Sequence, residues 1–168
     1  MARVAVLVDE MTEDDEFRVP CERLRAAGHE PVVVGLAKGK KLTALHGTEI
    51  TTDQAVDDVA AADFDAVVVP GGYSPDKIRT SEPMVALVRE TAAAGKPVAA
   101  VCHGPWLLAE SGLARGRTVT SWPSLQTDLR NAGAEWVDRE VVTDDGVITS
   151  RNPDDLPAFC DALLERLK

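Results

Sequence analysis

The sequence lacks the features that mark membrane-spanning, secreted and nucleic-acid-binding proteins. Its apolar runs, such as Val4–Val8 and Val98–Cys102, are about strand length, whereas a bilayer span needs roughly 20 apolar residues. Asp9 and Glu10 stand where a signal peptide would have its apolar core. Lys and Arg number 18 against 28 Asp and Glu, a formal net charge of −10 that disfavours phosphate backbones and anionic membranes. We expect a cytoplasmic protein without nucleic-acid or membrane partners.

Cysteine and aromatic residues are also scarce. The three cysteines, Cys21, Cys102 and Cys160, are an odd number at wide spacing, which suits neither a disulfide framework nor a cysteine zinc site. No cluster of ligand residues and no Gly-x-Gly-x-x-Gly run is present, so we expect neither a metal nor a cofactor. Apolar residues make up 45% of the 168 residues, and no linker or repeat interrupts them. One domain over residues 1–168 is the expectation.

Aliphatic runs alternate with helical patterns along the chain. The expected strands are Val4–Val8, Val32–Leu36, Ala66–Val69, Val98–Val101, Thr118–Thr120, Val141–Thr143 and Val147–Ser150. The expected helices begin after Thr12 as N-cap, cover Pro83–Ala94, Pro105–Glu110 and Ser124–Ala132, and begin again at Asn152–Pro153, while Lys38–Glu49 is expected to be a small hairpin. This alternation predicts an α/β sandwich with a mostly parallel sheet between helices. Ligands bind beyond the carboxyl ends of such strands, which directs attention to residues 9–16, 70–79 and 102–105.

Cys102 is the strongest candidate for chemistry. The buried strand Val98–Val101 delivers it onto a turn before a helix, the geometry of a nucleophile elbow, with small Ala100 and Gly104 two residues to either side. The N-terminus of the next helix favours a thiolate, and His103 supplies a base. A lone cysteine is more often part of the core, the interpretation we give Cys21 and Cys160 at helical spacing among apolar residues. His29 and His46 are expected to be solvated.

Two further segments supply candidate partners for the thiol. In the acidic run Glu13–Glu16, Glu16 adjoins an apolar stripe and can point inward, where a protonated carboxyl would hydrogen-bond the sulfur and would need a raised pKa. The alternative is a helix start stabilised by its dipole. Gly72 offers a backbone N–H that would form an oxyanion hole with that of His103. Asp76 adds a carboxylate on the same rim, with a helix cap or a surface ion pair as the alternative.

The motifs together resemble the ThiJ/PfpI family of the class I glutamine amidotransferase-like superfamily. The resemblance covers nearly the whole chain and is carried by the acidic run closed by Pro20, by Pro70-Gly71-Gly72 through Arg79, and by Val101-Cys102-His103-Gly104-Pro105. Gly133–Asp138 and Ser150–Pro153 are similar to the PfpI branch in particular. The family implies a flavodoxin-like three-layer sandwich.

The resemblance also implies roles for single residues. Cys102 is then the nucleophile, Glu16 the glutamate that contacts it, and His103 and the Gly72 N–H the base and oxyanion donor. In the PfpI branch a carboxylate from a neighbouring subunit orients the histidine, and Asp76 occupies that position. Glu13 is implied more weakly, as a carboxylate that lines the pocket.

The implied activity is that of a cysteine hydrolase or lyase on a carbonyl compound. Family members are described as intracellular peptidases, deglycases, glutathione-independent glyoxalases and stress proteins, so the substrate is a peptide, methylglyoxal or a glycation adduct. The distant His–Glu pair of glutamine-hydrolysing enzymes has no counterpart here. The alternatives are a redox-sensing stress protein whose Cys102 becomes a sulfinic acid held by Glu16, and a silent binding domain. We expect a homo-oligomer, a dimer or a hexamer, without a cofactor.

Overall fold

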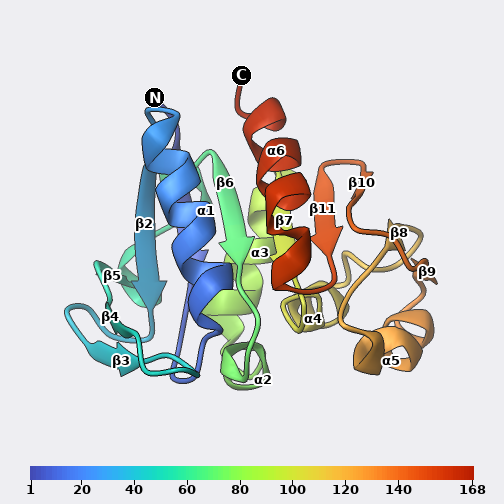
Figure 1. The fold of residues 1–168 in the computed structure, drawn as a ribbon, viewed down its shortest axis with the longest axis horizontal. Helices are drawn as coiled ribbons and strands as arrows, with labels where there is room; N and C mark the ends of the chain where they lie inside the picture. Colours follow the sequence, from blue (N-terminus) through green and yellow to red (C-terminus); the bar gives the residue numbers. More distant parts are fainter.

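The computed structural model describes residues 1–168 and has a seven-stranded sheet at its centre (Figure 1). The strand order is β10-β11-β7-β6-β1-β2-β5, and all neighbours are parallel except β10 and β11. The bounds are β1 Arg3–Leu7, β2 Glu30–Gly35, β5 Gln54–Ala55, β6 Ala66–Val69, β7 Val98–Val101, β10 Val142–Asp144 and β11 Val147–Ser150. The four residues each of β6 and β7 are all buried, as strands with helices on both faces require.

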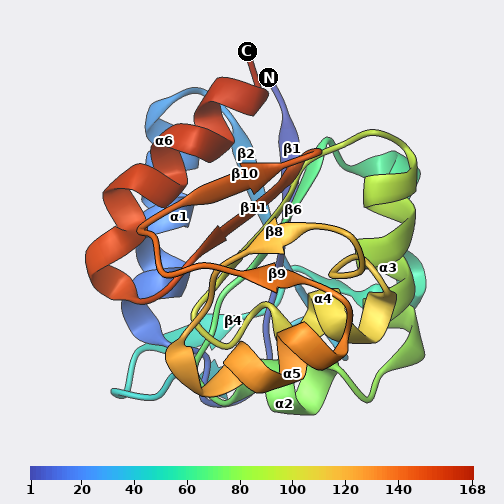
Figure 2. The same cartoon turned by 90° about the vertical axis from the view of Figure 1, so that its right-hand side faces the viewer.

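Helices cover both faces of this sheet. Helices α1 (Asp14–Ala26) and α6 (Leu156–Arg166) lie on one face, and α3 (Glu82–Ala93) and α4 (Trp106–Ser111) lie on the other (Figure 2). Alternate side chains of β1 enter two separate cores: Val4 and Val6 pack with the α1–α6 side, and Ala5 and Leu7 with the α3–α4 side. This is the two-residue period of a strand buried on both faces. The predicted fold class is confirmed.

Several local expectations differ from the structure. The N-cap of α1 is Glu13, whose carboxylate accepts the Glu16 N–H, while the Thr12 hydroxyl donates to the Asp9 carbonyl. Ser124–Ala132 divides into a 3₁₀ turn, Pro123–Leu125, and a short α5, Gln126–Asn131. The expected strand at Thr118–Thr120 is β8 (Thr118–Val119), which pairs with β9 (Glu135–Trp136) outside the main sheet. The hydrophobic pattern of the sequence does not predict which strand pairs with β8.

Other parts agree with the sequence reading. The polar excursion contains an antiparallel pair, β3 (Lys41–Thr43) and β4 (Glu49–Thr51). Asn152 caps the 3₁₀ turn Pro153–Asp155 that leads into α6. Cys21 and Cys160 are each 1% exposed within the α1–α6 core, so both are core residues as predicted. None of the helices combines the length and apolar composition that a bilayer crossing requires.

Candidate active site

The carboxyl ends of three adjacent strands define the candidate site. Strands β1, β6 and β7 are neighbours in the sheet, so the loops that follow them meet at one edge. They enclose a cavity of about 640 Å³. All six residues singled out from the sequence line it: Glu13, Glu16, Gly72, Asp76, Cys102 and His103. The remaining lining residues are Leu45, Tyr73, Trp106, Trp122 and Pro153.

Cys102 lies on a sharp turn between β7 and α4. Its φ of 62° falls in the left-handed region, which a residue with a side chain occupies only under constraint. Gly104 allows the turn, because a Cβ at that position would overlap the Val69 carbonyl oxygen. The Cys102 side chain is 8% exposed. The nucleophile elbow expected from the sequence is therefore the geometry that the chain adopts.

His103 contacts the sulfur directly. Its Nδ1 lies 3.2 Å from Cys102 Sγ, and its Nε2 lies 3.5 Å from Ser124 Oγ. The Trp106 ring meets the imidazole edge-on, with 5.2 Å between ring centroids, and the Trp122 ring stacks at 6.4 Å and 24°. Half-burial between the indoles lowers the pKa of His103. The imidazole is therefore held neutral near pH 7, able to accept the thiol proton at Nδ1.

Glu16 lies beneath the sulfur with no exposure to solvent. One oxygen, Oε1, accepts the Gly71 N–H at 2.8 Å, and the other, Oε2, is buried without a hydrogen-bond partner. Burial, with the nearby Glu13 carboxylate as second cause, raises the pKa of Glu16 to about 8. The carboxyl is therefore mainly protonated near pH 7, the state that a hydrogen-bond donor to the sulfur requires.

The Cys102 thiol is subject to opposing influences. Burial raises its pKa most, and the negative charge of Glu16 adds to this, whereas the backbone N–H groups of Gly72 and His103 lower the pKa. The thiolate-favouring donors expected from the helix start are present, but the pKa is raised because desolvation outweighs them. Protonation of Glu16 removes the repulsive charge. A neutral thiol beside a neutral imidazole is the arrangement that results, with Nδ1 of His103 within reach of the thiol proton.

Two glycines, Gly71 and Gly72, allow the loop after β6 to approach Glu16 and Cys102 closely. A Cβ on Gly71 would lie 2.5 Å from Glu16 Oε1 and 2.8 Å from Cys102 Cβ. Gly72 has a φ of +79°, and its Cβ would lie 2.5 Å from the Glu13 backbone nitrogen. Only residues without a side chain fit here. Because both residues lack a side chain, the Gly71 N–H can reach Glu16 and the Gly72 N–H can reach the Cys102 sulfur.

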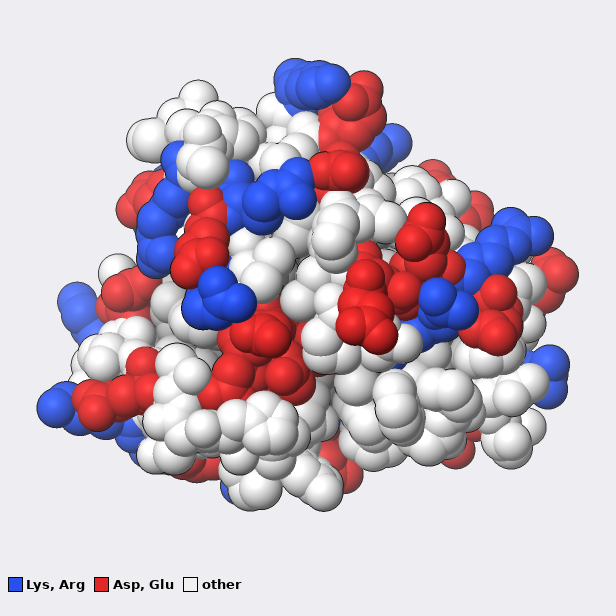
Figure 3. Space-filling model, in the orientation of Figure 1, with Lys and Arg blue, Asp and Glu red and all other residues white.

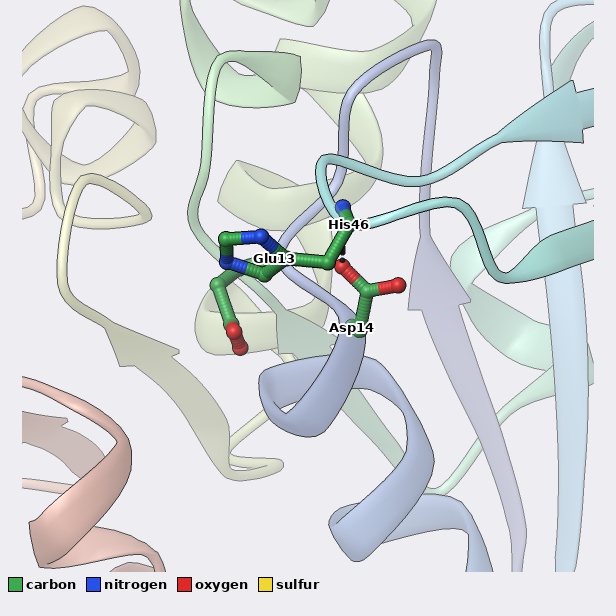
Figure 4. A group of neighbouring side chains, drawn as sticks. All are labelled: Glu13, Asp14 and His46. Carbon is green, nitrogen blue, oxygen red and sulfur yellow. Dashed lines mark hydrogen bonds between the residues drawn. The ribbon is translucent and has the colours of Figure 1, made fainter.

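The acidic start of α1 contains a group of possible metal ligands. Single ligand atoms of Glu13, Asp14 and His46 lie within 4.8 Å of one another, and Figure 4 shows the His46 imidazole beside the Glu13 side chain. The two Asp14 oxygens accept the N–H groups of His46 and Thr48, and Glu13 Oε2 accepts that of Glu16. These hydrogen bonds to backbone N–H groups are enough to explain why the three side chains lie close together. We assign no metal to it.

Asp76 is an exposed residue of α2 (Ser74–Ile78) and lines the cavity of its own chain. The site predicted from the sequence did not include the aromatic residues that line the cavity, Tyr73, Trp106 and Trp122. A signal for Trp106 was available, because it begins the helix that follows the elbow. Tyr73 directly follows the glycine pair, and only the fold shows that Trp122, whose backbone N–H donates to the Cys102 carbonyl at 2.9 Å, belongs to the same site.

A cysteine and a histidine on a strand-to-helix turn of a flavodoxin-like sandwich define a class of α/β proteins. The sequence model of the DJ-1/PfpI family matches residues 2–166, and the chain belongs to this family. It is 44% identical to "Protein/nucleic acid deglycase 2" of Escherichia coli, over 94% of this chain and 92% of that protein. It is 43% identical to "General stress protein 18" of Bacillus subtilis, with the same coverage of both chains.

A solved structure supports the same assignment. The DJ-1/ThiJ/PfpI-like and ferritin-like two-domain protein of Anabaena variabilis superposes with a TM-score of 0.97 at 42% identity, over 99% of this chain. The chain spans about half of that protein, 48% of its length. The family predicted from the motifs is confirmed.

Proposed function

We propose that the chain is a cysteine-dependent enzyme that removes dicarbonyl adducts of the methylglyoxal type, with Cys102 as nucleophile. The observation that carries this proposal is the contact of 3.2 Å between Cys102 Sγ and His103 Nδ1 inside the cavity. The deglycase name of the Escherichia coli relative supports the reaction class. Hydrolysis of a peptide bond starts with the same attack and is the alternative substrate reaction.

The first step is the formation of a bond between Sγ and the aldehyde carbon of the dicarbonyl. His103 takes the thiol proton at Nδ1, and the oxygen that becomes negative accepts hydrogen bonds from the N–H groups of Gly72 and His103. When the dicarbonyl arrives as an adduct, its C–S or C–N bond breaks first: the hydroxyl proton passes to the departing thiol or amine, and the free aldehyde that remains is attacked by Sγ. The product of this step is a hemithioacetal on Cys102.

The later steps need water but no oxidant. A proton moves from the former aldehyde carbon to its neighbour, which converts the hemithioacetal into a lactoyl thioester. Water then cleaves the C–S bond, so lactate leaves and the Cys102 thiol is restored. Methylglyoxal plus water equals lactate, so atoms and electrons balance. Glu16, protonated near pH 7, hydrogen-bonds the sulfur as charge develops on it.

A panel assay of the purified protein tests this proposal. Methylglyoxal, methylglyoxal-modified peptides and fluorogenic peptides are compared, with Cys102→Ser as the blank. We expect lactate release from the first two, and loss of that release in the variant because a hydroxyl needs a stronger base. Turnover of fluorogenic peptides alone would assign the peptidase reaction instead. Equal activity of Cys102→Ser and wild type would refute the mechanism.

A redox-sensing role is the second candidate. The buried Glu16 Oε2 without a partner beside Cys102 favours it, because a protonated carboxyl can hold a sulfinic acid oxygen, and a relative is named a general stress protein. Hydrogen peroxide would be the oxidant that takes the thiol to the sulfinic acid. Peroxide oxidation of Cys102 that is much faster than its turnover of methylglyoxal would favour this role.

A further inference from the structure

The cavity has an unusual charge composition. Three carboxyl groups line it, those of Glu13, Glu16 and Asp76, and no Lys or Arg does. Glu16 is mainly protonated near pH 7 and burial also raises the pKa of Glu13, so the exposed Asp76 is the main source of negative charge. Figure 3 shows acidic atoms gathered just below the centre of the face that α1 and α6 cover, near the start of α1. The mouth of the cavity is therefore negatively charged.

Two arginines that lie close to lining residues are neutralised by partners. Arg79, at the C-terminal end of α2, pairs with Glu110 at 3.0 Å and stacks over Trp106 at 5.1 Å from the ring centroid. Arg151, two residues before the lining residue Pro153, pairs with Asp155 and Asp138, each at 2.9 Å. Neither guanidinium lines the cavity. An anionic substrate would find no free cation there.

Aromatic faces complete the mouth. Tyr73 is 59% exposed and Trp122 is 42% exposed, large fractions for side chains of this kind. Ring faces attract ammonium and guanidinium groups. Carboxylates and open ring faces around one cavity together form a surface suited to a cation.

We propose that the cavity selects substrates that carry a positive charge next to the reacting carbonyl, such as adducts flanked by lysine or arginine. The inference deepens the proposed function, since it names the substrate class for the same Cys102. Asp76 is the specificity-determining residue at the rim, and Glu13 supports it from deeper in the cavity. Carbonyl compounds that carry a carboxylate next to the reacting carbon are disfavoured by the same charge.

Charged thiol reagents test the selection without any turnover. Wild-type protein is treated with methanethiosulfonates that carry either a trimethylammonium or a sulfonate group, and modification of Cys102 is followed by peptide mapping. Each rate is divided by the rate of the same reagent with 2-mercaptoethanol. We expect the cationic reagent to be favoured about tenfold in about 0.1 M NaCl and about threefold or less in about 1 M NaCl, where the screening length is shorter.

Matched variants locate the selecting charge. Asp76→Asn should reduce the cation preference by about threefold, a factor that corresponds to about 0.7 kcal/mol. Asp57→Asn removes one exposed carboxylate outside the cavity lining and should leave the ratio unchanged. Equal normalised rates for both reagents in wild-type protein, or equal effects of the two variants, would overturn the inference.

A substrate series separates this inference from the proposed function. Three peptides carry the same methylglyoxal-modified cysteine between two lysines, two glutamines or two glutamates. We expect kcat/KM to fall in that order, by about tenfold from the lysine to the glutamate peptide. Cys102-dependent turnover without this order would overturn the selection and leave the proposed function standing. If no peptide is turned over, the proposed function fails, and the reagent ratio still decides the selection.

Discussion

Replacement of Glu16 by glutamine should make the folded protein more stable at neutral and alkaline pH. The pKa of Glu16 is raised from 4.5 to about 8 by burial. The folded chain therefore keeps a proton that the unfolded chain releases near pH 4.5. The stability linked to this proton is complete below pH 4.5 and is lost as the pH rises to about 8. Glutamine stays neutral throughout and avoids this loss.

The magnitude follows from the linkage. Each pH unit between the two pKa values costs the wild type about 1.4 kcal/mol of unfolding free energy. At pH 7 the wild type has lost about 3 kcal/mol that Glu16→Gln retains, an upper value because the new amide must still fit beside Cys102. The side-chain oxygen of the introduced glutamine would accept the Gly71 N–H as Glu16 Oε1 does. A gain of this size corresponds to a rise in Tm of several degrees.

Urea unfolding of both proteins at several pH values measures this difference. The unfolding free energy of the variant minus that of the wild type should rise by about 1.4 kcal/mol per pH unit from about pH 5.5 to about pH 7.5. The contributions of the other titrating groups cancel in this difference. The pKa of the Cys102 thiol should also be lower in Glu16→Gln, since the charge of Glu16 raises the pKa of this thiol in the wild type. A stability difference that does not change with pH would refute the reasoning.

Three further predictions concern the loop beside Cys102, the core and the subunit interface. Gly71→Ala places a Cβ 2.8 Å from Cys102 Cβ, so we expect at least a tenfold loss of lactate release and about 1–3 kcal/mol of destabilisation by overpacking; unchanged kinetics would contradict the close approach. Cys21→Ala, at a core position 1% exposed, should lower Tm while kcat per folded molecule stays within about twofold; a proportionate loss of rate without loss of stability would be contrary evidence. The resemblance to the PfpI branch predicts that Asp76 also orients the His103 of a neighbouring subunit. Mixed Cys102→Ser and Asp76→Ala subunits should then regain part of the activity after verified exchange, and a fully active monomer would exclude this arrangement.

The layers of the fold could be predicted because each central strand is aliphatic on both faces. The bounds of Ala66–Val69 and Val98–Val101 are confirmed, since a run of four buried residues leaves no ambiguity in period. The predicted start of α1 is wrong, because Thr12 and Glu13 can both cap a helix. The choice depends on the bridge between Thr12 and Gly72, which is a long-range contact.

The elbow pair could also be predicted from the sequence, because Cys102 and His103 are adjacent and follow a buried strand. The complete burial of Glu16 could not be predicted from the sequence. Its raised pKa depends on complete burial, and the Gly71 N–H that opposes this rise is 55 residues away. The aromatic part of the mouth could not be predicted either, since Tyr73 and Trp122 come to line one cavity only in the folded chain.

Rapid quenching of the reaction with methylglyoxal, followed by mass spectrometry, tests the central claim most directly. The proposed mechanism predicts a transient lactoyl group on the peptide that contains Cys102, formed and lost at rates that match lactate release, and absent from Cys102→Ser. Lactate release at the wild-type rate with no modification of Cys102 at any time point would contradict the claim.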